Sequence, residues 1–272
     1  MCRALKVSRS GFYAWKTRPE SSHARETRRL DADIRRLFGA HKERAGSPKI
    51  TYLLQQEGWR VGKNRVAHRM REMGLRSKVR RAYRTTTDSR HKHPVAPNRL
   101  QRNFTAQGPD QVYVSDLTCI RTRSGWLYLT IILDLYSRLV VGWALSDSLS
   151  HEAVLKALRR AIGRRRPSRG LIFHSDRGVQ YACKSFRKAL KTHGFLSSMS
   201  RKGDPWDNAV AESFFHILKS ELVNHTMWEG YADAHRDLFE YIEVYYNQER
   251  IHSTLGYLTP VQFELQTVKS AA

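Results

Sequence analysis

The spacing of hydrophobic residues changes near residue 111, and this change constrains the fold of the 272-residue chain more than any other feature. Before it, apolar residues such as Leu30 and Ile34 recur every three to four positions, which predicts amphipathic helices. After it, Val112, Val114 and Ile120 fall on alternate positions, which predicts a strand with one buried face. The chain is therefore expected to join an all-α first part to a mixed α/β second part.

The first part contains a candidate helix-turn-helix. Helical spacing predicts four helices before residue 81, at 1–17, 28–41, 47–57 and 63–74. The short turn GWRVG separates the last two, and the second helix of such a pair enters the major groove of DNA. Because this second helix is basic, the expected DNA-binding residues are Lys63, Arg65 and Arg69.

The net charge of +23 at pH 7 is concentrated in the first part of the chain. Residues 1–108 carry 27 Lys and Arg against 8 Asp and Glu, which indicates a module that binds a polyanion such as double-stranded DNA. Residues 81–108 have no apolar periodicity and contain five arginines and two prolines, so they are expected to form a basic linker.

Hydrophobic runs and cysteines argue against several other classes of protein. No apolar run approaches the roughly 18–20 residues that span a membrane, and the N-terminus lacks the pattern of a secretory signal. The three cysteines are too widely spaced for a disulfide framework or a zinc half-site. A cytoplasmic protein without membrane contact is the simplest interpretation.

The second part has the element order of a ribonuclease-H-like α/β fold, a mixed sheet with flanking helices. Strands are expected at 111–120, 126–133, 139–145, 171–176 and 195–200. Helices are expected at 150–162, at 185–193, from about 205, and at 231–247. The expected domains are a helix-turn-helix region, the linker, a catalytic core and a helical tail, at 1–80, 81–108, 109–225 and 226–272.

Three acidic residues are expected to meet in this core. The end of the fourth strand lies beside the first strand in such a sheet, which would bring Asp176 next to Asp116, and the following helix could present Glu212. Three converging carboxylates repel one another, and bound cations relieve the repulsion. Oxygen ligands favour Mg²⁺, with Mn²⁺ as a substitute, and two such ions form the usual clamp for phosphoryl transfer.

The spacing of these acids resembles that of the DDE transposase and integrase superfamily. There are 59 residues between Asp116 and Asp176, and 35 between Asp176 and Glu212. Four blocks more closely resemble the second-frame product (OrfB) of IS-three-type bacterial insertion sequences, a family related to the retroviral integrase catalytic core. The blocks are SDLTCI, HSDRGVQY, SRKGDPWDNAVAESFFHILKSEL and YNQERIHSTLGYLTPVQFE.

The resemblance implies catalytic and metal-binding roles for Asp116, Asp176 and Glu212. It also implies that Lys219, two helical turns after Glu212, contacts a phosphate near the scissile bond. The implied activity is that of a transposase, a polynucleotidyl transferase that cuts DNA at terminal inverted repeats and transfers the strand to target DNA. The implied partners are paired DNA ends bound by a homo-oligomer, and the upstream OrfA product or its frameshift fusion, in the bacterial nucleoid.

Several interpretations stay open on the sequence alone. A catalytically silent, transposase-derived DNA-binding regulator is the alternative function. Arg250, in the tail, is a further candidate for DNA binding. Trp206 either stacks on an unpaired base or packs beneath its loop, and Asp134 is expected to be structural and to pair with Arg138.

Overall fold

The computed structural model describes residues 2, 7–78, 94–201 and 205–271. The chain divides into two compact units, Met1–Lys78 and Val79–Ala272. Each unit has hydrophobic core residues of its own. The first thirteen residues of the predicted linker, 81–93, lie outside the described residues.

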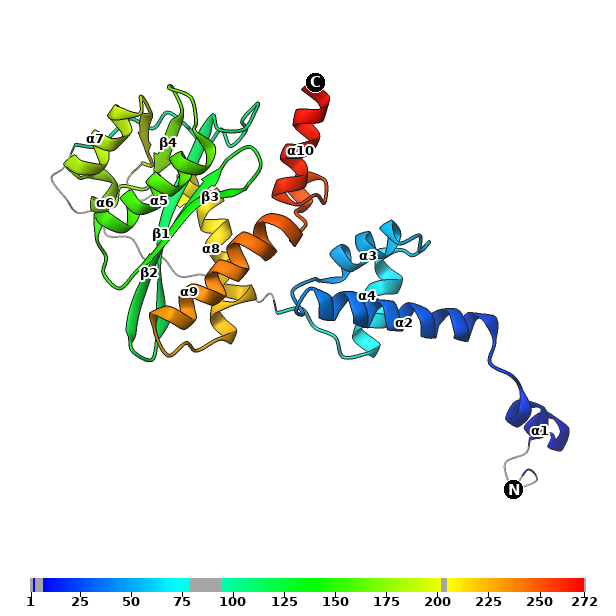
Figure 1. Cartoon of the computed structure of the whole chain (residues 1–272). Coiled ribbons are helices and arrows are strands. Elements are labelled where there is room, and N and C mark those ends of the chain that lie inside the picture. The colour runs from blue at the N-terminus through cyan, green and yellow to red at the C-terminus, as the bar shows by residue number, and fades with distance from the viewer. Residues whose placement is uncertain (1, 3–6, 79–93, 202–204, 272) are drawn as a thin grey trace. The chain divides into compact units, whose positions relative to one another are not determined.

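The smaller unit is helical, as the sequence predicts (Figure 1). Its helices are α1 (Arg9–Thr17), α2 (Ser22–Ala40), α3 (Ser47–Gln56) and α4 (Lys63–Glu72). The last three enclose a core of apolar side chains that includes Leu30, Ile34, Ile50, Leu54 and Val66. None of the described residues of α1 is buried, so this helix adds nothing to that core.

The helices α3 and α4 form the predicted helix-turn-helix. Val61, in the turn between them, is buried, and its carbonyl accepts a hydrogen bond from Nε2 of Gln55 at 2.9 Å. Nε1 of Trp59 donates to Asp33 on α2 at 3.0 Å. The turn is therefore fixed from both sides by side chains.

The larger unit is built on a mixed sheet, which confirms the predicted fold class. Its described strands are β1 (Val112–Thr122), β2 (Gly125–Asp134), β3 (Val140–Ser146), β4 (Ile172–Ser175) and β5 (Leu196–Met199). They lie in the order β3-β2-β1-β4-β5. The first three are antiparallel neighbours, whereas β4 runs parallel to β1 and β5 runs parallel to β4.

Helices cover both faces of this sheet (Figure 1). One face packs against α5 (His151–Arg165), α6 (Val179–Ala182) and α7 (Lys184–Thr192). The other packs against α8 (Ala209–Glu221), α9 (Tyr231–Phe239) and the π-helix η3 (Glu240–Glu249). The short 3₁₀ turn η1 (Pro205–Asn208) precedes α8, and η2 (Val223–His225) follows it. A further turn, η4 (Ser253–Leu255), and the helix α10 (Pro260–Ala271) complete the described fold.

Two helix ends differ from the sequence expectation. The helix predicted to stop at Gly163 continues as α5 to Arg165 and is closed by Arg166, which has a positive φ of 49°. The single helix predicted at 231–247 becomes a π-helix after Phe239, and the buried residues of that π-helix, which include Tyr241 and Tyr245, pack in the same apolar cluster as α8. The strand β3 approaches α5 closely at Gly142, where a Cβ would lie 2.4 Å from the carbonyl oxygen of Ala157.

The second half of the predicted linker packs on the larger unit. Leu100 is buried in the same apolar cluster as α8, and the amide N–H of Arg99 donates to Oγ of Ser198 at 2.9 Å. Residues 94–108 are therefore part of the folded core, because their few apolar and amide groups find partners there. The expectation of a linker is wrong for this half.

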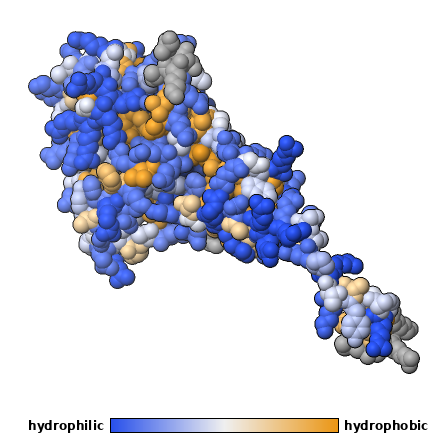
Figure 2. Space-filling model, turned by 45° about the vertical axis from the view of Figure 1, so that its right-hand side comes forward, coloured by the Kyte–Doolittle hydropathy of each residue, from blue (hydrophilic) through white to orange (hydrophobic). Residues whose placement is uncertain are grey.

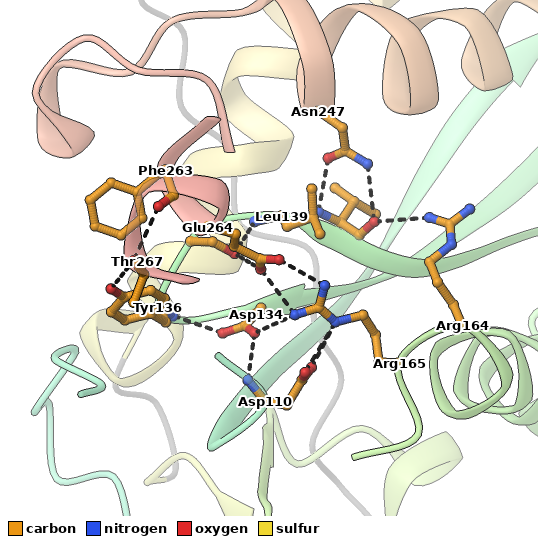
Figure 3. Close-up of polar contacts among 12 residues, drawn as sticks. Asp110, Asp134, Tyr136, Leu139, Arg164, Arg165, Asn247, Phe263, Glu264 and Thr267 are labelled. Carbon is orange, nitrogen blue, oxygen red and sulfur yellow. Dashed lines mark hydrogen bonds and ion pairs between the residues drawn. The ribbon is translucent and has the colours of Figure 1, made fainter. Parts of the chain in front are cut away.

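A polar network attaches α10 to the start of β1 (Figure 3). Arg165 donates to Asp110 at 2.9 Å and to Glu264 at 2.7 Å. The carboxylate of Asp134, which is fully buried, accepts the backbone N–H of Asp110 at 2.7 Å and that of Tyr136 at 2.8 Å. The expected ion pair of Asp134 with Arg138 is replaced by one with Arg165, at 3.9 Å, although the charges of Asp134 and Arg138 still interact at longer range.

The surface agrees with the charged composition. Hydrophilic residues cover most of the face seen in Figure 2, and hydrophobic residues gather in limited areas of it. Among the described residues, no helix is long and apolar enough to cross a membrane.

Candidate active site

The pairing of β1 with β4 brings two of the predicted acids together. Ser115 on β1 pairs with Ser175 on β4 in this parallel register. Asp116 directly follows Ser115, and Asp176 directly follows Ser175. Parallel strands keep successive residues side by side, so the two carboxylates start from neighbouring backbone positions. The side chain of Asp116 shares the face of β1 that carries Val114 and packs toward α8.

The third acid, Glu212, lies in the first turn of α8 and is partly buried. The positive end of the helix dipole favours a carboxylate at this position. Asn208, just before the helix, donates from Nδ2 to the carbonyl oxygen of Ser115 at 3.3 Å. This bond joins the start of α8 to β1 at the residue before Asp116.

The acids act on one another electrostatically. Burial raises the pKa of Asp116 well above its ordinary value, and the charges of Asp176 and Glu212 raise it further, whereas Lys219 lowers it. Burial and the charge of Asp176 also raise the pKa of Glu212. The three acids and Lys219 therefore share one electrostatic environment.

Backbone and hydroxyl groups hold the acids in place. One oxygen of Asp176 accepts the N–H of Gly178 at 2.9 Å, and a Cβ added to Gly178 would lie 3.0 Å from it. One oxygen of Asp116 accepts the N–H of Leu117 at 2.7 Å. Beneath them, the hydroxyl of Tyr181 on α6 lies 2.9 Å from Oγ of Ser115. The sequence interpretation missed Tyr181, although the block HSDRGVQY contains it.

The donor set fits a hard divalent cation. Three carboxylates on adjacent elements offer oxygen ligands, which Mg²⁺ and Mn²⁺ prefer, and the nearby residues supply no thiolate pair. Within the described part of the chain, no three His, Cys, Asp or Glu side chains meet closely enough to enclose a metal ion.

Other polar residues near the acids are structural. His174, which is fully buried, contacts Oγ of Ser198 at 2.8 Å and the carbonyl oxygen of Asp207 at 2.9 Å. Burial lowers the pKa of His174. These contacts occupy both ring nitrogens, so the imidazole orients the neighbouring turn.

The predicted DNA-binding residues of α4 differ in exposure. Lys63 is exposed. Arg69 instead donates two hydrogen bonds to Asp31 on α2, at 2.8 and 2.6 Å, and Arg65 donates to Glu26 at 2.9 Å. The remaining exposed polar residues of α4 are Asn64, His68, Arg71 and Glu72. The two predicted arginines thus brace α4 against α2.

Arg250 is buried, and the expectation that it contacts DNA is wrong. Its guanidinium donates to Glu221, the last residue of α8, at 2.9 and 3.1 Å. The side chains of Arg250 and Glu221 are 9% and 0% exposed. The positive charge of Arg250 is therefore paired with a buried carboxylate inside the unit.

Comparisons with known families and structures agree with this fold. The integrase core domain family matches residues 106–205, a second integrase core domain family matches 212–268, and an HTH-like domain matches 24–83. Among solved structures, a cryo-EM structure of a simian T-cell lymphotropic virus intasome aligns with a TM-score of 0.50 and 16% identity. That alignment covers 85% of this chain and 74% of the other chain. The chain thus falls in the class of proteins with an integrase core of the ribonuclease-H-like type.

Sequence relatives define the family within that class. Transposase InsF of insertion sequence IS3A from Escherichia coli K12 is 39% identical over 97% of this chain and 92% of that protein. A 31 kDa protein of insertion element IS600 from Shigella sonnei is 39% identical over the full length of both chains. The chain belongs to the IS3 family of insertion-sequence transposases.

Proposed function

We propose that the chain is a DDE polynucleotidyl transferase that cuts DNA at the terminal inverted repeats of an insertion sequence and joins the cut strand to target DNA. The observation that carries this proposal is the parallel register of β1 and β4, which puts Asp116 and Asp176 on neighbouring backbone positions. Glu212 in the first turn of α8 supplies the third carboxylate. Membership of the IS3 transposase family supports the same activity.

The residues of the site have separate roles in this proposal. Asp116 and Asp176 would hold divalent metal ions between them, and Glu212 would complete their ligand set. When bound, two Mg²⁺ or Mn²⁺ ions would activate water or a 3′-hydroxyl and stabilise the leaving oxygen. Lys219, whose charge already acts on Asp116, would bind the phosphate beside the scissile bond. Asn208 joins the start of α8 to β1, and Tyr181 joins α6 to the same strand, both through Ser115.

The helical unit would hold the DNA for this reaction. Its α4 is the second helix of a helix-turn-helix, and its exposed residues include Lys63 and Arg71. Because a transposon has two ends, we propose that copies of the chain act together on paired ends, with the upstream product of the element as a further partner. A silent regulator would bind the same DNA without cutting it.

The test is strand cleavage and joining on a labelled duplex that carries the end of the insertion sequence encoding this chain. The unmodified chain is compared with Glu212→Gln and with Glu229→Gln, a control acid that is 72% exposed and paired with Arg123. Reactions contain Mg²⁺ or Mn²⁺, with and without the upstream product. We expect cutting and joining by the unmodified chain and the control, and none by Glu212→Gln. Binding without cutting in every reaction would identify the regulator.

A further inference from the structure

Trp206, in the turn before α8, is exposed although tryptophan carries one of the largest apolar surfaces of any residue. Its exposed fraction is 68%, whereas the next two residues, Asp207 and Asn208, are buried. The residue therefore does not pack beneath its loop, which was one of the two interpretations that the sequence left open. Single exposed apolar side chains are common on protein surfaces, so the significance of Trp206 depends on where its turn lies.

Several hydrogen bonds fix the conformation of this turn, and in that conformation the side chain of Trp206 is exposed. The carboxylate of Asp207 accepts a hydrogen bond from the backbone N–H of Arg201 at 2.8 Å. It accepts two more from the guanidinium of Arg201, at 2.9 and 3.0 Å. It also accepts Nε of Arg102 at 3.2 Å and Nδ2 of Asn98 at 2.9 Å. A turn fixed by one buried carboxylate and three partner side chains cannot easily rotate Trp206 into the core.

The same turn is attached to both strands of the acid site. The carbonyl oxygen of Asp207 lies 2.9 Å from Nε2 of His174, two residues before Asp176. Asn208 donates to the carbonyl oxygen of Ser115, one residue before Asp116. These two contacts hold the two residues after Trp206 against the central strands β1 and β4, close to the positions of Asp116 and Asp176, so Trp206 lies in a turn next to the candidate active site.

The surroundings of Trp206 favour a nucleic-acid ligand over an apolar protein surface. Arg102 and Arg201, which fix the turn, have side chains that are 47% and 56% exposed. Both guanidinium groups bind the carboxylate of Asp207, the residue next to Trp206. An exposed aromatic ring in a basic segment is a combination that binds unpaired nucleotides, because the ring stacks on a base while the cations attract the backbone. The ring accepts any base, since every base has a π-face.

We propose that Trp206 is a stacking site for an unpaired nucleobase of the DNA end that the acids process. This inference rests on the proposed function, because it assigns to the same site a contact with a base that has left the duplex. The contact would hold the terminal nucleotides apart and present the adjoining phosphate to the acids. Opening a terminal base pair costs a few kcal/mol, and stacking on the indole offsets that cost.

The test combines changes in the protein and in the DNA. Binding of the full chain to an end-labelled duplex is measured by fluorescence anisotropy, in the Glu212→Gln background so that the DNA stays intact. Each of the terminal nucleotides is replaced in turn by an abasic site. We expect Trp206→Ala to weaken binding to the intact duplex by about ten-fold to a hundred-fold, and to have little effect when the stacked base is absent. Trp206→Phe should retain most of the binding.

Trp126 provides the matched control, since it is a second exposed tryptophan of the same unit, 54% exposed at the start of β2. Trp126→Ala should leave binding unchanged. The stacking site is overturned if Trp206→Ala weakens binding equally at every abasic duplex, or if Trp126→Ala has the same effect. Cleavage by the chain with its natural Glu212 is measured in parallel: base-dependent binding without cutting would uphold the stacking site and contradict the proposed transferase. Cutting without any base dependence would overturn the stacking site alone.

Discussion

Arg250 and Glu221 form a buried ion pair that joins the segment after η3 to the last residue of α8. Nη2 of Arg250 lies 2.9 Å from one oxygen of Glu221, and the hydroxyl of Tyr241 donates to the other at 2.9 Å. The helix α8 also carries Glu212 and Lys219. The position of these two residues therefore depends on a contact made more than 30 residues later in the chain than Glu212.

Removal of either partner of this pair should destabilise the larger unit. Arg250→Ala leaves the carboxylate of Glu221 buried without its cation, which typically costs about 3–5 kcal/mol. Replacement of both partners together, as in Arg250→Met with Glu221→Leu, should recover most of the loss, because no buried charge then remains. The free energy of unfolding is measured in urea. An equal loss in the single and double variants would contradict this account. The exposed pair Arg123 and Glu229 serves as the control, since Arg123→Ala should cost less than about 1 kcal/mol.

Neutralisation of the acids should separate stability from cleavage. Asp116→Asn removes a charge that burial and the neighbouring acids disfavour, so its unfolding free energy in the absence of divalent metal should equal or exceed that of the unmodified chain. Asp176→Asn and Glu212→Gln should behave similarly, and all three should lose cleavage while they keep DNA affinity. Thermal unfolding and cleavage are measured on the same preparations. A large loss of stability in Asp116→Asn would assign that residue a structural role instead.

Basic residues of α4 should fall into two groups. Lys63 and Arg71 are exposed, so each substitution by alanine should weaken DNA binding and reduce the slope of log affinity against log salt by about 0.9 per lost phosphate contact. Arg69→Ala breaks the two hydrogen bonds to Asp31, and it should cost about 1.5–3 kcal/mol of stability of the helical unit. Anisotropy titrations at several salt concentrations, together with urea unfolding, check both expectations. An unchanged salt slope in Lys63→Ala with Arg71→Ala would place the DNA elsewhere.

The buried Asp134 should make stability depend on pH. Burial raises its pKa to about 7 in the folded protein, from 3.8 in an exposed carboxyl, and the charges of Asp110 and Glu264 raise it as well. Between pH 3.8 and about pH 7, the carboxyl group of Asp134 is protonated in the folded chain and ionised in the unfolded chain. The contribution of Asp134 is therefore full below about pH 4, and it is lost as pH rises toward 7, at up to about 1.4 kcal/mol per pH unit.

Asp134→Asn isolates this contribution, since an amide cannot titrate. The difference in unfolding free energy between Asp134→Asn and the unmodified chain should shift in favour of the variant as pH rises from about 4 to 7. The charged neighbours Asp110, Glu264 and Arg165 are common to both proteins, so their contributions largely cancel in the difference. A difference that stays flat, or that shifts in favour of the unmodified chain, would contradict the raised pKa.

Local patterns in the sequence were enough to predict the fold class and the strand that carries Asp116. The alternation around Val112 and Val114 survives in the structure, because one face of β1 packs on α8 and the other on α5 to α7. Spacing alone also pointed to Asp176 and Glu212, which lie at the end of a strand and at the start of a helix. These features depend on neighbours along the chain.

The contacts that local patterns could not predict join distant segments. Arg165 binds Asp110 and Glu264, which are 55 and 99 residues away. Helical periodicity placed Arg65 and Arg69 on one side of α4, but only the position of α2 decides that this side meets its acids. Arg250 was a candidate for DNA binding because it is a basic residue of the tail, and its burial against Glu221, 29 residues earlier, could not be read from local sequence.

The two partners of the ion pair, Glu221 and Arg250, are synthesised at different times, Glu221 first. All three acids and the whole of α8 leave the ribosome before Arg250 does, so the end of this helix lacks its cation until residue 250 has been made. A polypeptide that terminates before residue 250 would carry every acid of the site and still lack the contact with the end of α8, the helix that carries Glu212. The fold thus makes the anchoring of the helix that carries Glu212 depend on a segment that is translated after it.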